Sequence, residues 1–295
     1  MLKGINSILG KWNRNKYEIL KKIGSGGIGE IYKAKDSKGN IKAIKISRDV
    51  TSITREFNIM KELSVLDGVP RVYELDDYYH KKRGTTLYFF VMELIEGNNL
   101  KEIIEKKNLS LKEITGIGIV LLKNLKKIRN KGYTYTDIKL ENILIDKISR
   151  RIVFVDFGGV TNNEWGIKEY TPAYNILSWG VKIKYNSIES TTFGITMIMI
   201  SLLFRRESNP LFENISDIIK RIKRLNIDCR FKKILITGIN AKYESIDAFI
   251  HQLNKLIVTL NVPSQKTRNF DVINVFFILS LCIFLFVIIY GLNIF

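Results

Sequence analysis

Residues 272–295 form a run without a single charged side chain, and this run constrains the chain more than any other feature of its sequence. A helix of that length, at about 1.5 Å per residue, is ~36 Å long and exceeds the ~30 Å hydrocarbon core of a bilayer. A buried helix of a globular domain is the weaker alternative, because such a helix is rarely apolar on every face. Lys255, Lys266 and Arg268 precede the run, and no Lys or Arg follows it. The length and apolarity of the run therefore predict a single-pass anchor in the cell membrane, and the positive-inside rule places the preceding residues in the cytoplasm.

The charge balance is strongly basic, since 47 Lys and Arg against 29 Asp and Glu give a formal net charge of +18. Such an excess favours anionic partners such as acidic lipid headgroups, phosphorylated ligands or nucleic acid, although lysine is abundant throughout the chain. No basic stretch carries interleaved aromatic residues in a nucleic-acid-binding pattern, so we expect no nucleic-acid partner. The two cysteines, Cys229 and Cys282, lie far apart, which argues against a disulfide scaffold or a cysteine metal site.

Residues 1–16 are predicted to form a separate amphipathic segment. Apolar residues recur there at helical spacing, with basic residues between them, at Leu2, Ile5, Ile8, Leu9 and Trp12. The pattern favours a short amphipathic helix, which would lie either on a membrane surface or against the folded domain. Docking on the domain is the favoured alternative.

The pattern of the chain changes near residue 97. Residues 17–97 are mostly short alternating segments separated by turn residues, which predicts an antiparallel sheet with one inserted helix at 54–68. Residues 98–260 have helical periodicity instead, with predicted helices at 99–108, 110–132, 189–206, 217–226 and 243–260. We therefore expect an α+β fold in which a sheet lobe precedes a helix lobe. A polar linker, residues 261–271, then leads to the run at 272–295.

A glycine-rich turn with the pattern G-x-G-x-x-G is formed by Gly24, Gly26 and Gly29. The pattern alone is weak, because dinucleotide-binding folds use the same letters before a helix. Here the following residues, 30–35, alternate as a strand does, which places the glycines at the tip of a hairpin. Without Cβ atoms, the backbone amides of this tip can approach a chain of phosphates closely. The hairpin is therefore a candidate phosphate-binding flap.

The next predicted strand, residues 41–47, places Ala43 and Lys45 on the same face. A small residue and an ammonium would then line one pocket beneath the flap. A solvent-facing lysine is the plain alternative for any single basic residue. Glu56, from the helix that follows, is expected to pair with Lys45 and hold it towards phosphate oxygens. Glu62 is the competing partner, but it lies nearly two turns further along the helix.

The order of these features resembles the protein kinase family, in particular the eukaryotic-like (Hanks-type) serine/threonine kinases of bacteria. The glycine-rich loop, strand lysine and helix glutamate are followed by VMELIEGNNL, which is similar to the hinge between the lobes of a kinase. The resemblance implies a bilobal kinase fold and an ATP site. It assigns further residues to the nucleotide, namely Ile31, Ala43, Met92, Glu93 and Ile95. Met92 would be the gatekeeper, and the adenine edge would bind the carbonyl of Glu93 and the amide of Ile95.

Residues 135–142, YTDIKLEN, resemble the family's catalytic loop, H-R-D-x-K-x-x-N. Asp137, Lys139 and Asn142 match, and a later apolar run ends in D-F-G, which adds Asp156. The resemblance implies that Asp137 accepts the hydrogen bond of the substrate hydroxyl and that Lys139 neutralises the transferring phosphoryl group. Asn142 and Asp156 would hold Mg²⁺. Lys139 resembles the serine/threonine branch, so the expected activity is ATP-dependent phosphorylation of Ser and Thr in protein substrates near the membrane.

The sequence departs from the family at Tyr135 and Thr136, where histidine and arginine are usual. In the family this arginine pairs with a phosphorylated residue of the activation segment, so Thr136 predicts an enzyme that is active without that phosphate. Residues 171–174, TPAY, match the family's pattern, but the A-P-E motif that should follow is replaced by residues 176–178, ILS.

These departures leave a second hypothesis open, a pseudokinase that binds nucleotide or a partner at the membrane without turnover. Retention of Lys45, Glu56, Asp137, Asn142 and Asp156 favours catalysis, because a binding module does not need all five. A kinase of small molecules or lipids is a third hypothesis. The lysine of DIKLEN and the TPAY segment favour a protein substrate instead.

Overall fold

The computed structural model describes residues 1–2, 5–162, 171–181 and 188–261. The chain divides into two compact units, Met1–Ile257 and Val258–Phe295, and the fold given below is that of the first unit. The predicted linker after Asn261 and the apolar run at 272–295 lie outside the described residues. Within the part of the chain that is described, no helix is long and apolar enough to cross a membrane.

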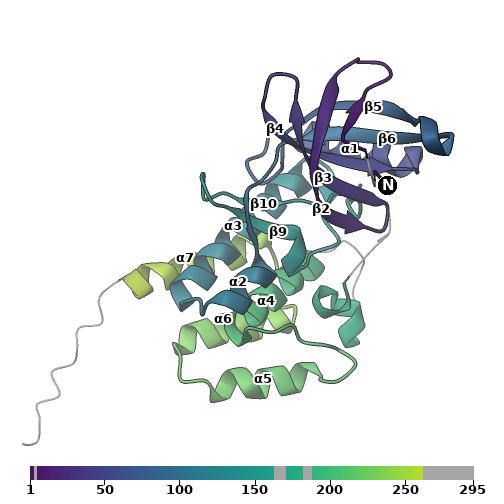
Figure 1. Cartoon of the computed structure of the whole chain (residues 1–295). Helices are drawn as coiled ribbons and strands as arrows, with labels where there is room; N and C mark the ends of the chain where they lie inside the picture. The colour runs from purple at the N-terminus through teal and green to yellow at the C-terminus, as the bar shows by residue number, and fades with distance from the viewer. Residues whose placement is uncertain (3–4, 163–170, 182–187, 262–295) are drawn as a thin grey trace, which may run out of the picture. The chain divides into compact units, whose positions relative to one another are not determined.

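The small lobe is an antiparallel sheet of six strands in the order β1-β2-β3-β4-β6-β5 (Figure 1). Its strands are β1 (Ser7–Leu9), β2 (Lys16–Gly26), β3 (Gly29–Asp36), β4 (Ile41–Ser47), β5 (Val72–His80) and β6 (Thr85–Met92). A short 3-10 turn, Lys81–Arg83, joins β5 to β6. The sheet lobe that the alternating pattern predicted is confirmed.

The inserted helix, α1 (Val50–Leu63), begins four residues before the predicted start at residue 54. The Asp49 side chain accepts a hydrogen bond of 3.1 Å from the Ser52 amide and so caps the helix. The buried face combines an apolar stripe with one carboxylate, at Ile53, Glu56, Phe57, Ile59, Met60 and Leu63. This face packs on β4, β5 and β6. The packing places the carboxylate against the middle of the sheet.

The large lobe is mainly helical (Figure 1). Its helices are α2 (Leu100–Lys106), α3 (Leu111–Asn130), α4 (Ile188–Phe204), α5 (Ile215–Arg224), α6 (Cys229–Ile239) and α7 (Ile246–Asn261). All but α6 overlap predicted segments, with bounds that differ by up to three residues. The α6 segment is short, and its second half combines β-branched residues with Gly238, which all have low helix propensity. Helix α4 is buried on nearly every face and packs against α3 and α6, where it forms the centre of the lobe.

Short strands and turns fix the loops between the helices. Strands β7 (Gly97–Asn99), β9 (Ile143–Asp146) and β10 (Ile152–Phe154) form one small sheet, and β8 (Tyr133–Thr134) pairs with β11 (Thr161–Asn162). Three further 3-10 turns are Leu140–Asn142, Pro172–Tyr174 and Ile176–Trp179. The loop at 135–142 therefore starts and ends next to strands, as does the segment at 155–160. Both are held at the edge of the large lobe.

The predicted amphipathic helix within residues 1–16 is wrong. Residues Ser7–Leu9 form β1, which pairs antiparallel with β2 and extends the sheet. Leu2 and Ile8 are only 3% and 1% exposed, and they pack into a hydrophobic cluster with side chains of β2, β3, β4 and β6. The Trp12 amide donates 2.9 Å to the Asp76 carboxylate, which ties the following turn to β5. The segment docks on the domain, and it does so as a strand because β2 offers free backbone groups.

Replacing Ile8 by Ala is expected to lower the free energy of unfolding by about 2–4 kcal/mol, because a buried isoleucine loses its contacts and leaves a cavity. The matched control is Leu9→Ala on the same strand, since the Leu9 side chain is 49% exposed. That substitution should change the free energy of unfolding by less than about 0.5 kcal/mol. Urea unfolding followed by fluorescence measures both. Equal effects would show that this segment does not contribute to the core of the sheet.

Candidate active site

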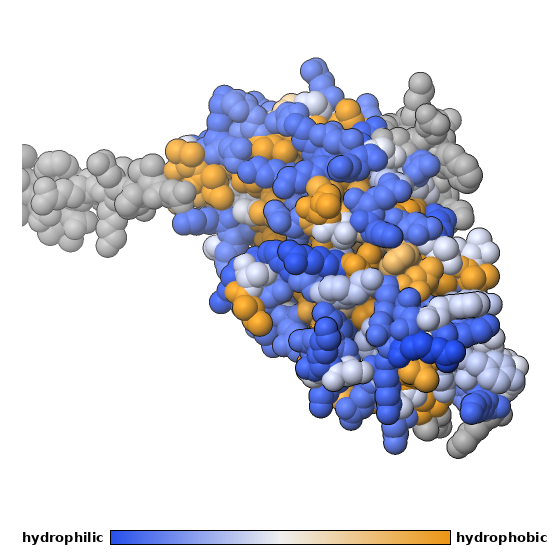
Figure 2. Space-filling model, turned by 90° about the horizontal axis from the view of Figure 1, so that it is seen from above, coloured by the Kyte–Doolittle hydropathy of each residue, from blue (hydrophilic) through white to orange (hydrophobic). Residues whose placement is uncertain are grey.

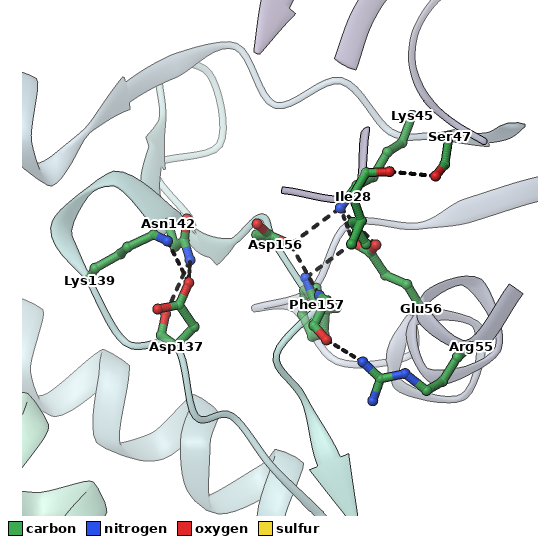
Figure 3. Close-up of polar contacts among 11 residues, drawn as sticks. Ile28, Lys45, Ser47, Arg55, Glu56, Asp137, Lys139, Asn142, Asp156 and Phe157 are labelled. Atoms are coloured by element: carbon green, nitrogen blue, oxygen red, sulfur yellow. Dashed lines mark hydrogen bonds and ion pairs between the residues drawn. The ribbon is translucent and has the colours of Figure 1, made fainter. Parts of the chain in front are cut away.

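The glycine-rich turn joins β2 to β3, and Gly26 pairs with Gly29 across it. A Cβ atom at Gly29 would clash with the backbone carbonyl of Ile46 in β4, so this position requires glycine. The Ser47 hydroxyl donates to the carbonyl of Ile28 near the tip of the turn (Figure 3). The hairpin predicted from the alternation is present, and β4 holds it in place.

A cleft of about 850 Å³ lies beneath this hairpin. Most residues assigned to the nucleotide line it, namely Gly24, Gly26, Ile31, Ala43, Lys45, Met92, Glu93 and Ile95. Gly29 does not, because it packs against β4. Leu144 and Val155 also line the cleft, although they were not predicted. A signal for both exists in the sequence, since Val155 directly precedes Asp156 and Leu144 follows Asn142 by two residues.

Lys45 and Glu56 form a buried ion pair at the cleft, where they are 4% and 1% exposed. Lys45 Nζ lies 2.7 Å from Glu56 Oε1 and 3.3 Å from Asp156 Oδ1 (Figure 3). Burial disfavours the ammonium, but the two carboxylates outweigh it and raise the pKa of Lys45. The competing Glu62 accepts a hydrogen bond of 2.7 Å from the Tyr133 hydroxyl instead. The expected pairing of Lys45 with Glu56 is therefore present.

The D-F-G residues point in two directions, with Asp156 lining the cleft and Phe157 buried in the core. Burial would raise the pKa of Asp156, but the Lys45 ammonium and a backbone amide lower it overall, so the carboxylate is charged. The Phe157 amide donates 3.3 Å to Glu56 Oε1. The Phe157 ring meets the ring of Tyr135 edge-on, with 5.5 Å between centroids. Tyr135, at the place of the family's histidine, is thus a packing residue.

Asp137, in the loop between β8 and β9, is held by three other side chains. Lys139 Nζ lies 2.5 Å from Oδ2, and Asn142 Nδ2 donates 3.0 Å to the same oxygen. Thr171 Oγ1 donates 2.9 Å to Oδ1. Burial disfavours the charge of Lys139, yet Asp137 raises its pKa overall, so this lysine carries its charge beside the carboxylate. The contact of Thr171 was not predicted, because the two residues are distant in the chain.

Asn142 and Asp156, the residues assigned to Mg²⁺, both line the cleft. Their oxygens are the hard donors that Mg²⁺ prefers, and nucleotide-bound Mg²⁺ usually takes only one or two protein ligands. Since Asn142 Nδ2 donates to Asp137, the amide oxygen is the atom left for a metal ion. Within the described ranges no group of three His, Cys, Asp or Glu side chains could hold a metal. The donor set therefore fits a Mg²⁺ ion that a nucleotide also binds.

The charges around the cleft suit a reaction of phosphate groups. Lys45 and Lys139 lie on either side of Asp156 in Figure 3, so two cations flank the space where a phosphate chain would lie. Asp137 presents a fixed carboxylate at the large-lobe side. Phosphoryl transfer depends on positioning and charge neutralisation rather than on a protein nucleophile, and these groups supply both.

Comparison with known proteins agrees with this geometry. The protein kinase domain family matches residues 17–269. The serine/threonine-protein kinase YabT of Bacillus subtilis is 32% identical over 252 residues, which are 83% of this chain and 73% of YabT. A probable serine/threonine-protein kinase of Clostridium perfringens, CPE1738, is 33% identical over 51% of this chain and 22% of its own length. Serine/threonine-protein kinase D of Synechocystis is 30% identical over 50% of this chain and 30% of its own length. The chain belongs to the protein kinase family and is a serine/threonine protein kinase.

Proposed function

We propose that this kinase transfers the γ-phosphate of ATP to Ser and Thr hydroxyls of proteins at a membrane, using the residues assigned above. The observation that carries the proposal is one cleft lined by Lys45, Asp156 and Asn142. Lys45 pairs with the buried Glu56 behind it, and Asn142 binds Asp137 in the same loop. These groups come from β4, α1 and two loops of the large lobe. Charged groups from four elements that converge at one cleft are typical of a reaction centre.

Asp137 acts on the acceptor hydroxyl in this proposal. Thr171 and Asn142 hold its carboxylate in one orientation, so it accepts the hydroxyl hydrogen bond and orients the oxygen for attack. Lys139, beside it, neutralises charge on the transferring phosphoryl group. Lys45 binds the phosphates deeper in the cleft. Asn142 and Asp156 would hold Mg²⁺, which supplies further neutralisation of the nucleotide phosphates.

The alternative of a pseudokinase rests on the altered H-R-D and A-P-E motifs. It predicts nucleotide binding without transfer of phosphate.

The full chain, incubated with Mg²⁺, γ-labelled ATP and a generic protein acceptor, is expected to yield acid-stable phosphoserine or phosphothreonine. Label on lipid alone would favour the lipid-kinase hypothesis. Nucleotide binding with no label on any acceptor would replace the proposed enzyme by a binding module.

Membrane attachment is the second part of the proposal, and the apolar run at 272–295 supports it. A single span would keep the kinase within reach of membrane-bound substrates. Figure 2 shows a mostly hydrophilic face with smaller hydrophobic patches, as expected of a surface in water. The net charge of +18 suggests a further electrostatic attraction to anionic lipid headgroups.

The full chain is expected to remain with membranes after carbonate extraction, whereas fragment 1–262 should be released. With vesicles, that fragment should bind phosphatidylserine-containing bilayers at low salt, lose most binding above about 0.3 M salt because charges are screened, and ignore neutral bilayers. Flotation measures both the retention of the full chain on membranes after carbonate and the binding of the fragment to vesicles. Release of the full chain by carbonate would rule out the span, and salt-independent or absent vesicle binding would show that the basic charge is not used on lipid.

A further inference from the structure

Three consecutive backbone carbonyls, those of residues 158–160, accept hydrogen bonds from two side chains. Arg55 donates from its two terminal nitrogens to the carbonyls of Gly158 and Val160, with 3.0 Å for the second. Thr136 donates 2.5 Å to the middle carbonyl. Figure 3 shows Arg55 on α1 with its guanidinium directed at the D-F-G segment. The segment is thus bound from the small lobe and from the large lobe at once.

Each of the two donors is the direct neighbour of a residue of the proposed reaction centre. Arg55 precedes Glu56, which pairs with Lys45, and Thr136 precedes Asp137. A shift of residues 158–160 would therefore change the positions of Glu56 in the small lobe and Asp137 in the large lobe. The two donors connect the orientation of α1 to the position of the catalytic loop through one short stretch of backbone.

The fit of this stretch against the catalytic loop is close. A Cβ atom at Gly159 would lie 3.1 Å from Asp137 Cβ and 3.4 Å from Thr136 Oγ1. Contacts of this length leave little free space beside Asp137. The backbone at Gly159 thus packs directly against the side chain proposed to orient the substrate hydroxyl.

The chemistry of the two donors explains why they can fix the backbone. A guanidinium is permanently charged and planar, so its two terminal nitrogens reach alternate carbonyls at a set spacing with charge-assisted bonds. A threonine hydroxyl has one donor hydrogen, which the carbonyl between them uses. The three carbonyls are thus satisfied by an arginine and a threonine side chain, which donate these hydrogen bonds without any modification.

We propose that Arg55 and Thr136 are positioning residues that hold residues 158–160, and with them Asp156 and Asp137, in the active arrangement without phosphorylation of the activation segment. The proposal rests on the phosphotransfer function proposed above. It assigns to Arg55 a role that the sequence did not reveal. It also gives Thr136 a task of its own, beyond the loss of an arginine.

Arg55→Met in the full chain is expected to lower kcat at least about tenfold, because Asp156 and Asp137 lose their fixed positions. KM for ATP should stay within about threefold, because the residues assigned to the adenine, Met92, Glu93 and Ile95, keep their places in the cleft. Arg55→Lys should recover part of kcat, since an ammonium donates without the planar spacing. Lys61→Met, an exposed position on the same helix, is the matched control and should leave both constants unchanged. Thermal unfolding of each variant identifies any loss that is due to misfolding.

The Thr136 contact has its own matched pair. Thr136→Val keeps the shape of the side chain and removes the hydrogen-bond donor, so kcat should fall, whereas Thr136→Ser should keep most of the wild-type kcat.

Wild-type enzyme treated with a phosphatase beforehand should keep its kcat. Unchanged kcat in Arg55→Met and Thr136→Val, or loss of wild-type activity after the phosphatase, would overturn the proposal.

Hydrogen exchange separates this proposal from the proposed function. In Arg55→Met the amides of residues 157–162 should exchange faster than in the wild type and in Lys61→Met, whether or not phosphate is transferred. A wild type that transfers no phosphate would rule out the proposed function, while faster exchange in the variant would still show that Arg55 holds residues 158–160. Equal exchange in all three proteins would refute this role of Arg55 even if the enzyme is active.

Discussion

Asp137→Asn is expected to lower kcat by about 10²–10⁴, the usual range for removing a positioned acid–base group. The carboxylate is 6% exposed, and Lys139, Asn142 and Thr171 all bind it. An asparagine has nearly the same shape, so it can occupy the site, but its amide group cannot accept the hydroxyl hydrogen bond with a full charge. Transfer of labelled phosphate from ATP to a protein acceptor measures the effect.

The matched control is Asp67→Asn, because the Asp67 side chain is 85% exposed and lies outside the nucleotide cleft. It should leave kcat unchanged. ATP affinity, measured by direct binding, should be within about threefold of the wild type in both variants, since neither aspartate lines the cleft. Equal transfer by wild type and Asp137→Asn would contradict the assignment of Asp137. It would show that the transfer does not arise from this site and would favour the pseudokinase hypothesis.

Local pattern was sufficient to predict the small-lobe part of this site, whereas Asp137, Asn142 and Asp156 were assigned through the resemblance to the kinase family. The alternation after the glycines placed the hairpin tip, and strand periodicity placed Ala43 beside Lys45 on the cleft side. Position along the helix was enough to prefer Glu56 over Glu62, because Glu56 directly precedes Phe57 at the start of the apolar stripe and Glu62 lies nearly two turns further on. In each case the neighbours along the chain determine the geometry, so a sequence pattern reports it directly.

Contacts with distant backbone could not be predicted in the same way. Residues 1–16 have helical spacing, yet they form a strand because β2 was available as a partner, and no local pattern records a partner elsewhere. Arg55 binds backbone carbonyls, which every residue type possesses, so nothing in the sequence of residues 158–160 marks them as acceptors. Thr171 reaches Asp137 only through the fold of the segment between them.

Lys45→Met is expected to lower kcat/KM for ATP by about 10²–10³, since removing one preorganised charge from a reaction centre has effects of this size. It should also lower the free energy of unfolding by about 3–5 kcal/mol, because Glu56 remains buried at 1% exposure without its counter-ion. Transfer assays and urea unfolding of the same preparations give the two numbers. Lys35→Met is the matched control on neighbouring β3, where the Lys35 side chain is 47% exposed and its ion pair with Glu18 is on the surface.

A second substitution separates the two effects of losing Lys45. In Lys45→Met with Glu56→Gln, no buried charge is left without a partner at this position, so a large part of the lost unfolding free energy should return. Activity should stay as low as in Lys45→Met alone, because the cation that binds the phosphates is still missing. Recovery of both quantities would mean that Lys45 serves only to neutralise Glu56 in the folded protein. Recovery of neither would mean that Asp156, 3.3 Å from Lys45 Nζ, is the carboxylate whose charge Lys45 chiefly balances.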